Sequence, residues 1–235
     1  MNPFFVAIDT AEIGRALALA RQVRGHAGGL KLGLEFFSAQ GPEGVRRVAA
    51  LGLPLFLDVK LHDIPNTVAK AVEALAPLRP TVLTVHAAGG QAMLEAAKAA
   101  APPETKVVAV TVLTSLDESD LAAAGVQGSP TEQVARLANL ARKSGIDGIV
   151  CSGAEVAQVR AIWPDGFFVV PGVRPAGVDA GDQKRVVTPA EALAKGASVV
   201  VVGRAVTDAP DPARAIMDIA ASVAQTPGEA RYVTR

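Results

Sequence analysis

Residues 54–70 read PLFLDVKLHDIPNTVAK, a nearly continuous apolar run that carries charges of both signs and ends at a proline able to open a helix. In a strand, side chains two residues apart point to the same face, which places Phe56, Asp58 and Lys60 together. The other face is entirely apolar and consists of Leu55, Leu57 and Val59. We therefore expect a strand whose apolar face packs against helices while its charged face turns away from them.

Further apolar runs are spread along the chain, at 4–9, 29–34, 81–87, 106–114, 147–152, 167–174 and 197–205. Segments with helical periodicity separate them, and in residues 130–145 the apolar positions that recur at helical spacing are Val134, Leu137, Ala138 and Ala141. Strands that are apolar on both faces are typical of a parallel sheet covered by helices. Eight strand–helix units in 235 residues predict an α/β fold, a single (β/α)8 TIM barrel over 1–235, because such barrels usually have about 250 residues.

An open, doubly wound sheet is the alternative architecture. No G-x-G-x-x-G motif follows the first apolar run, which weakens a dinucleotide-binding form of that fold. Within the barrel, residues 115–125 are expected to add a short helix above the fifth strand. Residues 226–235 are expected to form an exposed tail.

Composition narrows the classes of function. The 23 basic and 23 acidic residues balance, and no long basic run suggests a nucleic-acid or membrane partner. Cys151 is the single cysteine, so an internal disulfide is excluded and a reducing compartment is favoured. The first ten residues do not resemble a signal peptide, and no apolar run reaches the roughly 18 residues of a membrane span. We expect a soluble, cytoplasmic protein.

The active site of such a barrel lies at the C-terminal ends of the strands. Asp58 and Lys60 fall late in the third strand, and Lys31 and Asp63 are within reach, so a cluster of alternating charges is predicted in the mouth of the barrel. Charges buried there are costly unless they are paired, and such clusters are common at functional sites. The alternative is an internal salt-bridge network that only stabilises the barrel.

A phosphate site is predicted beside this cluster, because barrels often bind phosphate between the loops after strands seven and eight. The loop 171–189 is long, rich in glycine and proline, and carries Arg174 and Gln183. After the eighth strand, Gly203 allows close approach of the backbone to an anion and Arg204 adds positive charge. For Arg204 alone, a plain solvated arginine is the alternative.

Other motifs are missing from the sequence. It contains no H-E-x-x-H, no C-x-x-C and no P-loop motif, and histidines occur only at positions 26, 62 and 86, so a histidine metal site is not predicted. For His62 and His86 a structural role is favoured over a catalytic one. Cys151 is expected in the core.

With the cluster and the loops assigned, the segment FLDVKLHDIPNTVAKAV closely resembles the D-x-K-x-x-D-I-P-N-T signature of the orotidine 5'-phosphate decarboxylase family. The segments VAIDT, LKLGLEFF, VTVLTS, VVPGVRPAG and VVGRAVTDAPDP resemble the family in the same order, over nearly the whole chain. The resemblance implies decarboxylation of orotidine 5'-monophosphate to uridine 5'-monophosphate, the last step of de novo pyrimidine synthesis. It also implies a homodimer with shared sites, no metal and no organic cofactor.

The resemblance implies a role for each matched residue. Lys60 would donate the proton beside Asp58, with Lys31 at the ribose and Asp9 at the nucleotide. Asp63 would reach the site of the partner subunit, with Ile64 and Thr67 beside it. The residues matched to the base and the phosphate are Thr114, Ser115, Arg174, Gln183, Gly203 and Arg204.

Two other classes of function remain as alternatives. The first is a metal-dependent decarboxylase or aldolase of the same barrel group that acts on a sugar phosphate. Such relatives carry an acidic metal ligand where this chain has Lys31, and an ammonium group would repel Mg²⁺. The second is a non-catalytic, phosphate-binding dimeric barrel, which has no need of the charged cluster.

Overall fold

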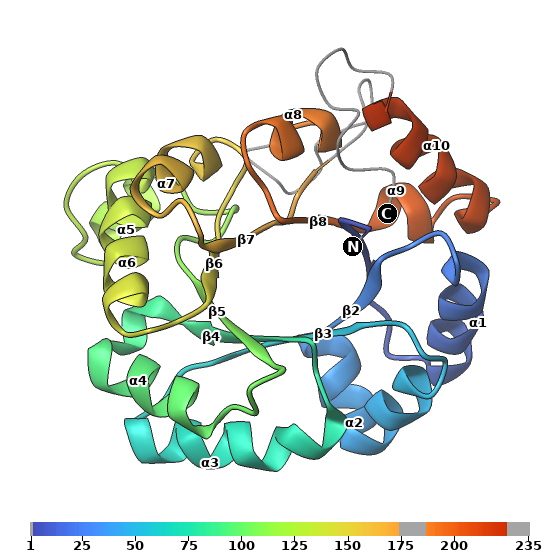
Figure 1. Ribbon diagram of the computed structural model, residues 1–235, viewed down its shortest axis with the longest axis horizontal. Helices are drawn as coiled ribbons and strands as arrows, with labels where there is room; N and C mark the ends of the chain where they lie inside the picture. The colour runs from blue at the N-terminus through green and yellow to red at the C-terminus, as the bar shows by residue number, and fades with distance from the viewer. Residues whose placement is uncertain (1, 174–186, 225–235) are drawn as a thin grey trace.

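The computed structural model describes residues 2–173 and 187–224, and within them eight parallel strands close into a barrel in the order β1 to β8, with β8 paired to β1 (Figure 1). Helices surround the barrel on the outside, which confirms the predicted (β/α)8 architecture. The predicted tail, 226–235, lies outside the described residues, so the single domain over 1–235 stays a prediction.

The strands are β1 Phe4–Ile8, β2 Gly29–Gly33, β3 Leu55–Leu61, β4 Val82–His86, β5 Lys106–Val110, β6 Gly148–Val150, β7 Phe167–Val170 and β8 Val199–Val202. The α-helices are α1 Ile13–Val23, α2 Leu34–Ala49, α3 Pro65–Leu75, α4 Gln91–Ala100, α5 Glu118–Ala123, α6 Pro130–Lys143, α7 Val156–Ile162, α8 Pro189–Ala194, α9 Arg204–Thr207 and α10 Pro212–Ala224. Short 3-10 helices are η1 Ala76–Leu78 and η2 Ala87–Gly89.

The strands bury one set of side chains inside the barrel and the alternate set beneath the helices. The interior is filled by a small apolar cluster that consists of Phe5, Ala7, Phe56, Val82, Val108, Val169, Val199 and Val201. The rings of Phe5 and Phe56 meet edge to face, with centroids 6.4 Å apart. The larger core outside the strands includes Leu55, Leu57 and Val59, as the period of two in β3 predicts.

The helix α6 shows how local sequence sets an element. The hydroxyl of Ser129 accepts a hydrogen bond from the N–H of Glu132, and the Glu132 carboxylate accepts one from the N–H of Ser129, a capping box that fixes the start of the helix. The residues it buries are the predicted ones, Val134, Leu137, Ala138 and Ala141. In the described residues, no helix is long and apolar enough to cross a membrane.

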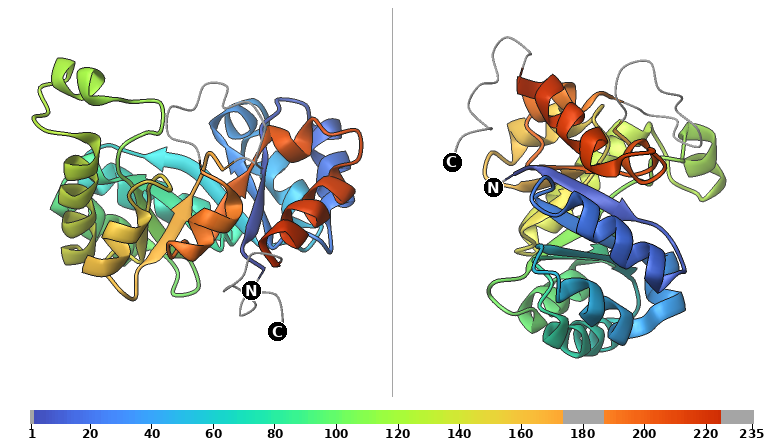
Figure 2. Two further views of the ribbon diagram at one scale, coloured as in Figure 1. Left: turned by 90° about the horizontal axis from the view of Figure 1, so that it is seen from above. Right: turned by 90° about the vertical axis from the view of Figure 1, so that its right-hand side faces the viewer.

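Each predicted strand contains an observed strand, but most predicted strands extend beyond the observed one at one or both ends. The run 106–114 is one of the larger overestimates, because β5 ends at Val110. The N–H and the hydroxyl of Thr111 both donate to the carbonyl oxygen of Val150, at 3.2 and 2.8 Å, and the chain then leaves the barrel. Val112 stays buried beyond the strand, which explains why the apolar pattern continues. The short helix predicted in 115–125 is α5, which stands beyond the C-terminal ends of the strands (Figure 2).

Gly148 in β6 lies so close to β7 that any side chain there would collide with backbone. A Cβ atom at Gly148 would lie 1.7 Å from the carbonyl oxygen of Phe167, its partner in the strand register. At Gly14 in α1, by contrast, an added Cβ would meet nothing within 4 Å. The barrel therefore closes at β6 only with glycine at this position.

We predict that Gly148→Ala lowers the free energy of unfolding by about 3 kcal/mol or more, because strand backbones must separate to admit the methyl group. Gly14→Ala makes the same chemical change and is expected to leave stability unchanged or to raise it slightly. Chemical unfolding followed by circular dichroism compares the two variants. Equal stabilities would contradict the close packing of β6 against β7.

Candidate active site

The penultimate residue of the third strand has a left-handed backbone. Lys60 has a φ of 50°, a conformation that costs a non-glycine residue about 1–3 kcal/mol and persists only where the surroundings hold it. The pairing with β4 shifts at the same place, since Leu57 lies opposite Leu83 whereas Leu61 lies opposite Val85. Such bulges re-aim side chains and are frequent beside active sites.

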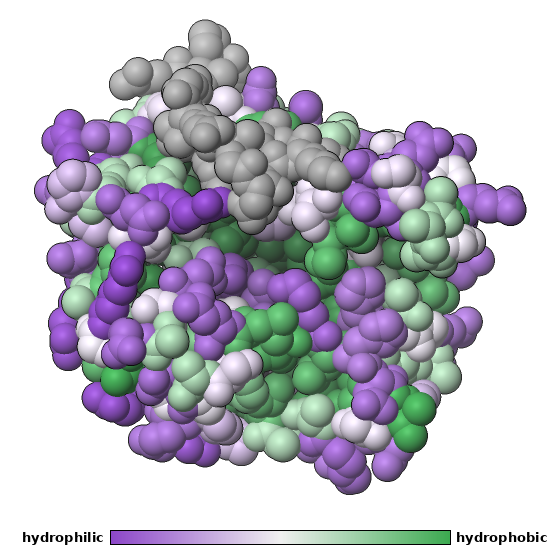
Figure 3. All heavy atoms as spheres, turned by 180° about the vertical axis from the view of Figure 1, so that it is seen from behind, coloured by the Kyte–Doolittle hydropathy of each residue, from purple (hydrophilic) through white to green (hydrophobic). Residues whose placement is uncertain are grey.

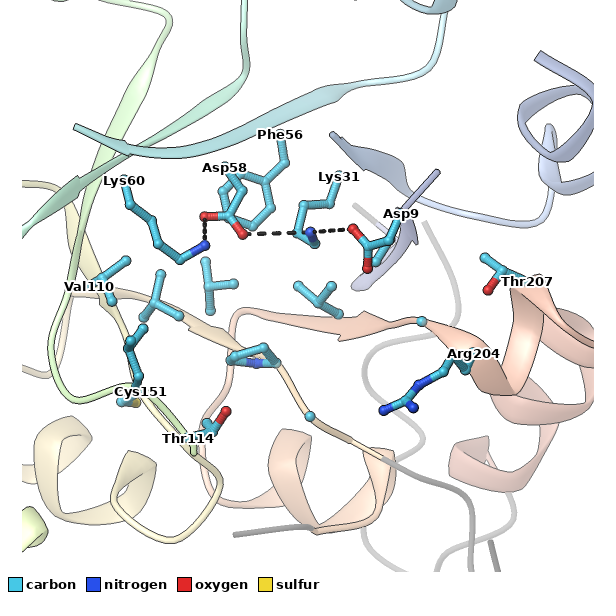
Figure 4. A pocket seen from close by; sticks show the side chains of 18 of the residues that line it. Asp9, Lys31, Phe56, Asp58, Lys60, Val110, Thr114, Cys151, Arg204 and Thr207 are labelled. Carbon is cyan, nitrogen blue, oxygen red and sulfur yellow. Dashed lines mark hydrogen bonds and ion pairs between the residues drawn. The ribbon is translucent and has the colours of Figure 1, made fainter. Parts of the chain in front are cut away.

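Four charged side chains at the ends of β1, β2 and β3 form a chain of alternating sign (Figure 4). The Lys31 Nζ atom lies 3.1 Å from Asp9 Oδ1 and 3.6 Å from Asp58 Oδ2, and Lys60 Nζ lies 2.9 Å from Asp58 Oδ1. The side chains of Lys31 and Asp58 are only 12% and 13% exposed. Each of these two central groups has an opposite charge on either side, which is what a desolvated charge requires.

These charges line one side of a pocket of about 560 Å³ at the C-terminal end of the barrel. Its apolar lining comes from the top of the barrel interior and the neighbouring strands, and includes Ala7, Phe56, Val110, Val150, Val169 and Val201. Seen from behind, the molecule shows a hollow with hydrophobic residues in its depth and hydrophilic residues along its rim (Figure 3). A ligand here would meet fixed charges on one side and apolar groups on the other.

The pocket lining also includes Arg204 and the ion pair of Arg15 with Asp208. Gly203 directly follows β8 and Arg204 begins α9, and both residues line the pocket. Figure 4 shows Arg204 and Thr207 at the opposite end of the pocket from Lys60. Arg174 and Gln183, the other two predicted phosphate ligands, lie outside the described residues.

Two of the predicted positions need correction. The predicted strand 106–114 would place Thr114 and Ser115 at the end of strand five, but they lie in the loop between β5 and α5, where Thr114 lines the pocket and Ser115 is exposed and does not. Asp63 does not join the cluster within its own chain. Its carboxylate accepts a hydrogen bond of 2.7 Å from the N–H of Ile64, and Asp63, Ile64 and Thr67 are exposed, away from the pocket lining. The chain turns into α3 directly after β3, which carries this segment outward.

Sequence reasoning missed two residues that shape the cluster. Gly33 lies opposite Asp58 in the strand register, and a Cβ atom there would be 3.0 Å from Lys31 Nζ and 3.3 Å from Asp9 Oδ1. A glycine at the end of a strand is a signal for such close approach, so it was available in the sequence. The second residue is Thr84 of β4, whose hydroxyl contacts both Asp58 and the backbone of Lys60.

The ammonium group of Lys31 stands between the carboxylates of Asp9 and Asp58, where a divalent cation would have to lie to use both. Across 2–173 and 187–224, no group of three histidine, cysteine or acidic side chains could hold a metal ion. The residues at this place thus suit a fixed ammonium group better than Mg²⁺.

His86, the last residue of β4, stacks on His62 with ring centroids 5.2 Å apart. Burial lowers the pKa of His86, and the nearby His62 and Lys60 lower it further. The Nδ1 atom of His86 accepts a hydrogen bond of 3.3 Å from the N–H of Ala88, which requires that nitrogen to be unprotonated. Neither ring lines the pocket, in keeping with a structural role for the pair.

The fold and the site together define an enzyme of the (β/α)8-barrel class, with a charged cluster and an arginine in one pocket at the C-terminal ends of its strands. Residues 2–219 match the family model described as orotidine 5'-phosphate decarboxylase / HUMPS family. The chain is 62% identical over 222 residues to the orotidine 5'-phosphate decarboxylase of Sphingopyxis alaskensis, which covers 94% of this chain and 99% of the relative.

Two further comparisons agree. The enzyme of the same name from Novosphingobium aromaticivorans is 57% identical over 222 residues, with the same coverage of 94% and 99%. The crystal structure of orotidine 5'-phosphate decarboxylase from Lactobacillus acidophilus superposes with a TM-score of 0.83 at 36% identity, covering 95% of this chain and 99% of that chain. The chain belongs to the orotidine 5'-phosphate decarboxylase family, which confirms the family predicted from the sequence.

We predict that His86 makes the protein less stable in acid. Because the pKa of His86 is lowered on folding, the unfolded chain binds more protons as the pH falls through about 6.5, the ordinary value for histidine. Stability is therefore lost below that pH and is fully present above it. In His86→Asn, whose side-chain oxygen can still accept the Ala88 N–H, the loss between pH 8 and pH 5.5 is expected to be smaller. Denaturant titrations at both pH values measure the difference, and an identical loss in both proteins would contradict this assignment.

Proposed function

We propose that the protein decarboxylates orotidine 5'-monophosphate to uridine 5'-monophosphate and CO2, in keeping with its family. The observation that carries the proposal is the alternating series of charges Asp9–Lys31–Asp58–Lys60, which holds an ammonium group in the pocket, facing its apolar side. Loss of CO2 from a pyrimidine leaves an electron pair on a ring carbon that has no electron sink. A fixed positive charge near that carbon is what the reaction needs.

Lys60 is the proposed catalytic acid. The bond between the ring carbon and the carboxyl carbon breaks, CO2 leaves, and the electron pair stays on the ring carbon. The Nζ ammonium of Lys60 stabilises that pair and then transfers its proton to the carbon, after which Lys60 recovers a proton from solvent. Its side chain is 30% exposed, which leaves a path to water.

The other charged side chains of the cluster position the ammonium group of Lys60. Asp58 holds the Lys60 ammonium at 2.9 Å, and Lys31 in turn holds the other oxygen of Asp58. In this proposal Lys31 and Asp9 also contact the ribose and the nucleotide. Because these groups are fixed before the substrate arrives, little reorganisation is needed when the ring charge develops.

The opposite end of the pocket is proposed to bind the phosphate. Arg204 supplies positive charge there, and a Cβ atom at Gly203 would meet only the Cβ of Ala7, at 3.9 Å. The open space suits close approach of a ligand to the backbone. Arg174 and Gln183 are proposed to complete the clamp. Binding energy from the distant phosphate then contributes to the chemical step by holding the ring at Lys60.

Thr114 and Ser115 are the residues proposed beside the base. The first already lines the pocket in the loop after β5, opposite the charged strands. The second is exposed and would have to turn inward when the base binds. The apolar groups around them lower the local dielectric and so strengthen the charge interactions of the cluster.

The proposal includes a homodimer in which each subunit completes the site of its partner. Asp63, Ile64 and Thr67 are exposed at the start of α3, on the side of the barrel where the pocket opens. Three large apolar side chains exposed in the described residues also follow strand ends: Leu34 at 52%, Ile64 at 66% and Leu113 at 39%. Apolar side chains gathered on a functional face favour a protein partner, and a second copy would cover them while it brings Asp63 to the site.

We further propose that the enzyme uses no metal and no organic cofactor and works in the cytoplasm, where its single buried cysteine would remain reduced. The alternative reaction, a metal-dependent decarboxylation or aldol cleavage of a sugar phosphate, would need a divalent cation between Asp9 and Asp58, where the ammonium group of Lys31 lies. A decarboxylation assay in the presence of EDTA therefore separates the two reactions. Turnover of orotidine 5'-monophosphate that vanished with EDTA would overturn the metal-free proposal.

In the same assay, Lys60→Ala is expected to reduce kcat by about 10⁴-fold or more, because it removes both the proton and the charge that stabilises the ring carbon. Binding of uridine 5'-monophosphate is expected to survive, since the phosphate end of the pocket is untouched. Lys143→Ala, at the exposed end of α6, is the matched control and is expected to keep full activity. Near-normal turnover by Lys60→Ala would rule out the assigned role.

Mixed dimers test the shared site. Lys60→Ala and Asp63→Ala homodimers are each expected to be inactive, but a heterodimer would contain one site with both residues intact. Random exchange of equal amounts should then restore about a quarter of the wild-type activity, because half of the dimers are mixed and each has one working site. If subunit exchange is verified by mass and no activity returns, Asp63 does not serve the partner.

A further inference from the structure

At the bulge in β3, a single residue of β4 replaces part of the regular backbone hydrogen-bond ladder between the two strands. Leu57 pairs with Leu83 and Leu61 pairs with Val85, so the three residues 58, 59 and 60 all lie opposite Thr84. A regular ladder would give the N–H of Lys60 a backbone carbonyl. Here that N–H donates instead to the side-chain hydroxyl of Thr84, at 2.9 Å.

The same hydroxyl has a second partner. Thr84 Oγ1 donates its proton to Asp58 Oδ1 at 3.1 Å, and this is the carboxylate oxygen that Lys60 Nζ contacts at 2.9 Å. A hydroxyl has one proton to give, and the Lys60 N–H occupies a lone pair, so the direction of both bonds is fixed. Backbone of Lys60, hydroxyl of Thr84, carboxylate of Asp58 and ammonium of Lys60 thus form a closed ring.

Thr84 is completely buried in β4 and does not line the pocket. Val82, which shares its face of the strand, belongs to the cluster that fills the barrel interior. Thr84 is therefore held by packing on every side, and its hydroxyl can act on the substrate only through Asp58 and Lys60.

We propose that Thr84 is a positioning residue, whose hydroxyl holds the left-handed backbone of Lys60 and the carboxylate of Asp58 in the one geometry that aims the Lys60 ammonium into the pocket. The inference rests on the proposed function, because it assigns Thr84 to the proton donor of that reaction. Thr84 does not touch the substrate, so its loss affects the chemical step rather than binding. Mispositioning of a catalytic group by even about 1 Å is known to cost large factors in rate.

The test compares Thr84→Val, which keeps the shape and removes the hydroxyl, with Thr84→Ser, which keeps the hydroxyl. Thr84→Val is expected to lower kcat for orotidine 5'-monophosphate by about 10- to 100-fold. The dissociation constant of uridine 5'-monophosphate, measured by calorimetry, is expected to stay within about threefold of the wild-type value, and Thr84→Ser to keep kcat within about threefold.

A second buried threonine provides the matched control. Thr105 precedes β5 at the other end of the barrel, is 1% exposed, and donates its hydroxyl to the carbonyl oxygen of Pro80 at 2.8 Å. Thr105→Val removes a hydroxyl of equal burial and is expected to lower the melting temperature while leaving kcat within about twofold. If Thr84→Val does not fold, Thr84→Cys replaces it, because a thiol is a weak hydrogen-bonding group. The kcat of Thr84→Cys is expected to be lower than that of Thr84→Ser, by up to about 100-fold relative to the wild type.

The outcomes separate the two claims. A wild-type protein without decarboxylase activity overturns the proposed function itself. With an active wild type, Thr84→Val at full kcat overturns the positioning role. Parallel losses of kcat and of nucleotide binding, or a serine variant as slow as the valine variant, would show that Thr84 only supports the fold, and this too overturns the inference.

Discussion

The carboxylate of Asp58 is the group on which the candidate site depends. One of its oxygens accepts from Lys60 Nζ and from the Thr84 hydroxyl, and the other lies 3.6 Å from Lys31 Nζ. The side chain of Asp58 is only 13% exposed, so burying its charge without a partner would cost free energy. The same holds for each of the two lysines beside the apolar lining of the pocket. Each charge is tolerated because its neighbours are present. The cluster therefore behaves as one unit, in which single substitutions are not expected to add.

The two ends of the barrel use charge differently. At the N-terminal end, Asp147 accepts from Lys98 Nζ at 2.6 Å and from the N–H of Val107 at 2.8 Å, and Arg160 donates to the carbonyl oxygens of Gly196 and Gly166. Those side chains mainly form hydrogen bonds with backbone N–H and C=O groups near them. At the C-terminal end, the charged side chains line an open pocket of about 560 Å³. These side chains pair with one another rather than with backbone groups, so they remain available to a ligand, which fits the usual division of this fold into a stabilising and a functional end.

Much of this arrangement could be predicted from the sequence, because period-two patterning is a strong signal in buried strands. The faces of β3 and the core residues of α6 were predicted correctly, and Lys31, Asp58 and Lys60 do meet in the pocket. The pattern could not show the left-handed backbone at Lys60, since that depends on the shift in pairing with β4. It also could not show that Asp63 lies away from the cluster of its own chain, because that depends on the path of the backbone between β3 and α3.

The bulge at the end of β3 links these observations. A regular strand would carry residues 58 and 60 on one face about 7 Å apart, a separation that a lysine side chain can span. Here residues 58–60 all lie opposite Thr84, and Lys60 Nζ contacts Asp58 Oδ1 at 2.9 Å. The strained φ of Lys60 is thus the local cost of this pairing, and it is offset by the hydrogen bond of its N–H to Thr84. In this barrel, the strained backbone of Lys60 and the hydrogen bond of its N–H to Thr84 are two consequences of one change in strand register.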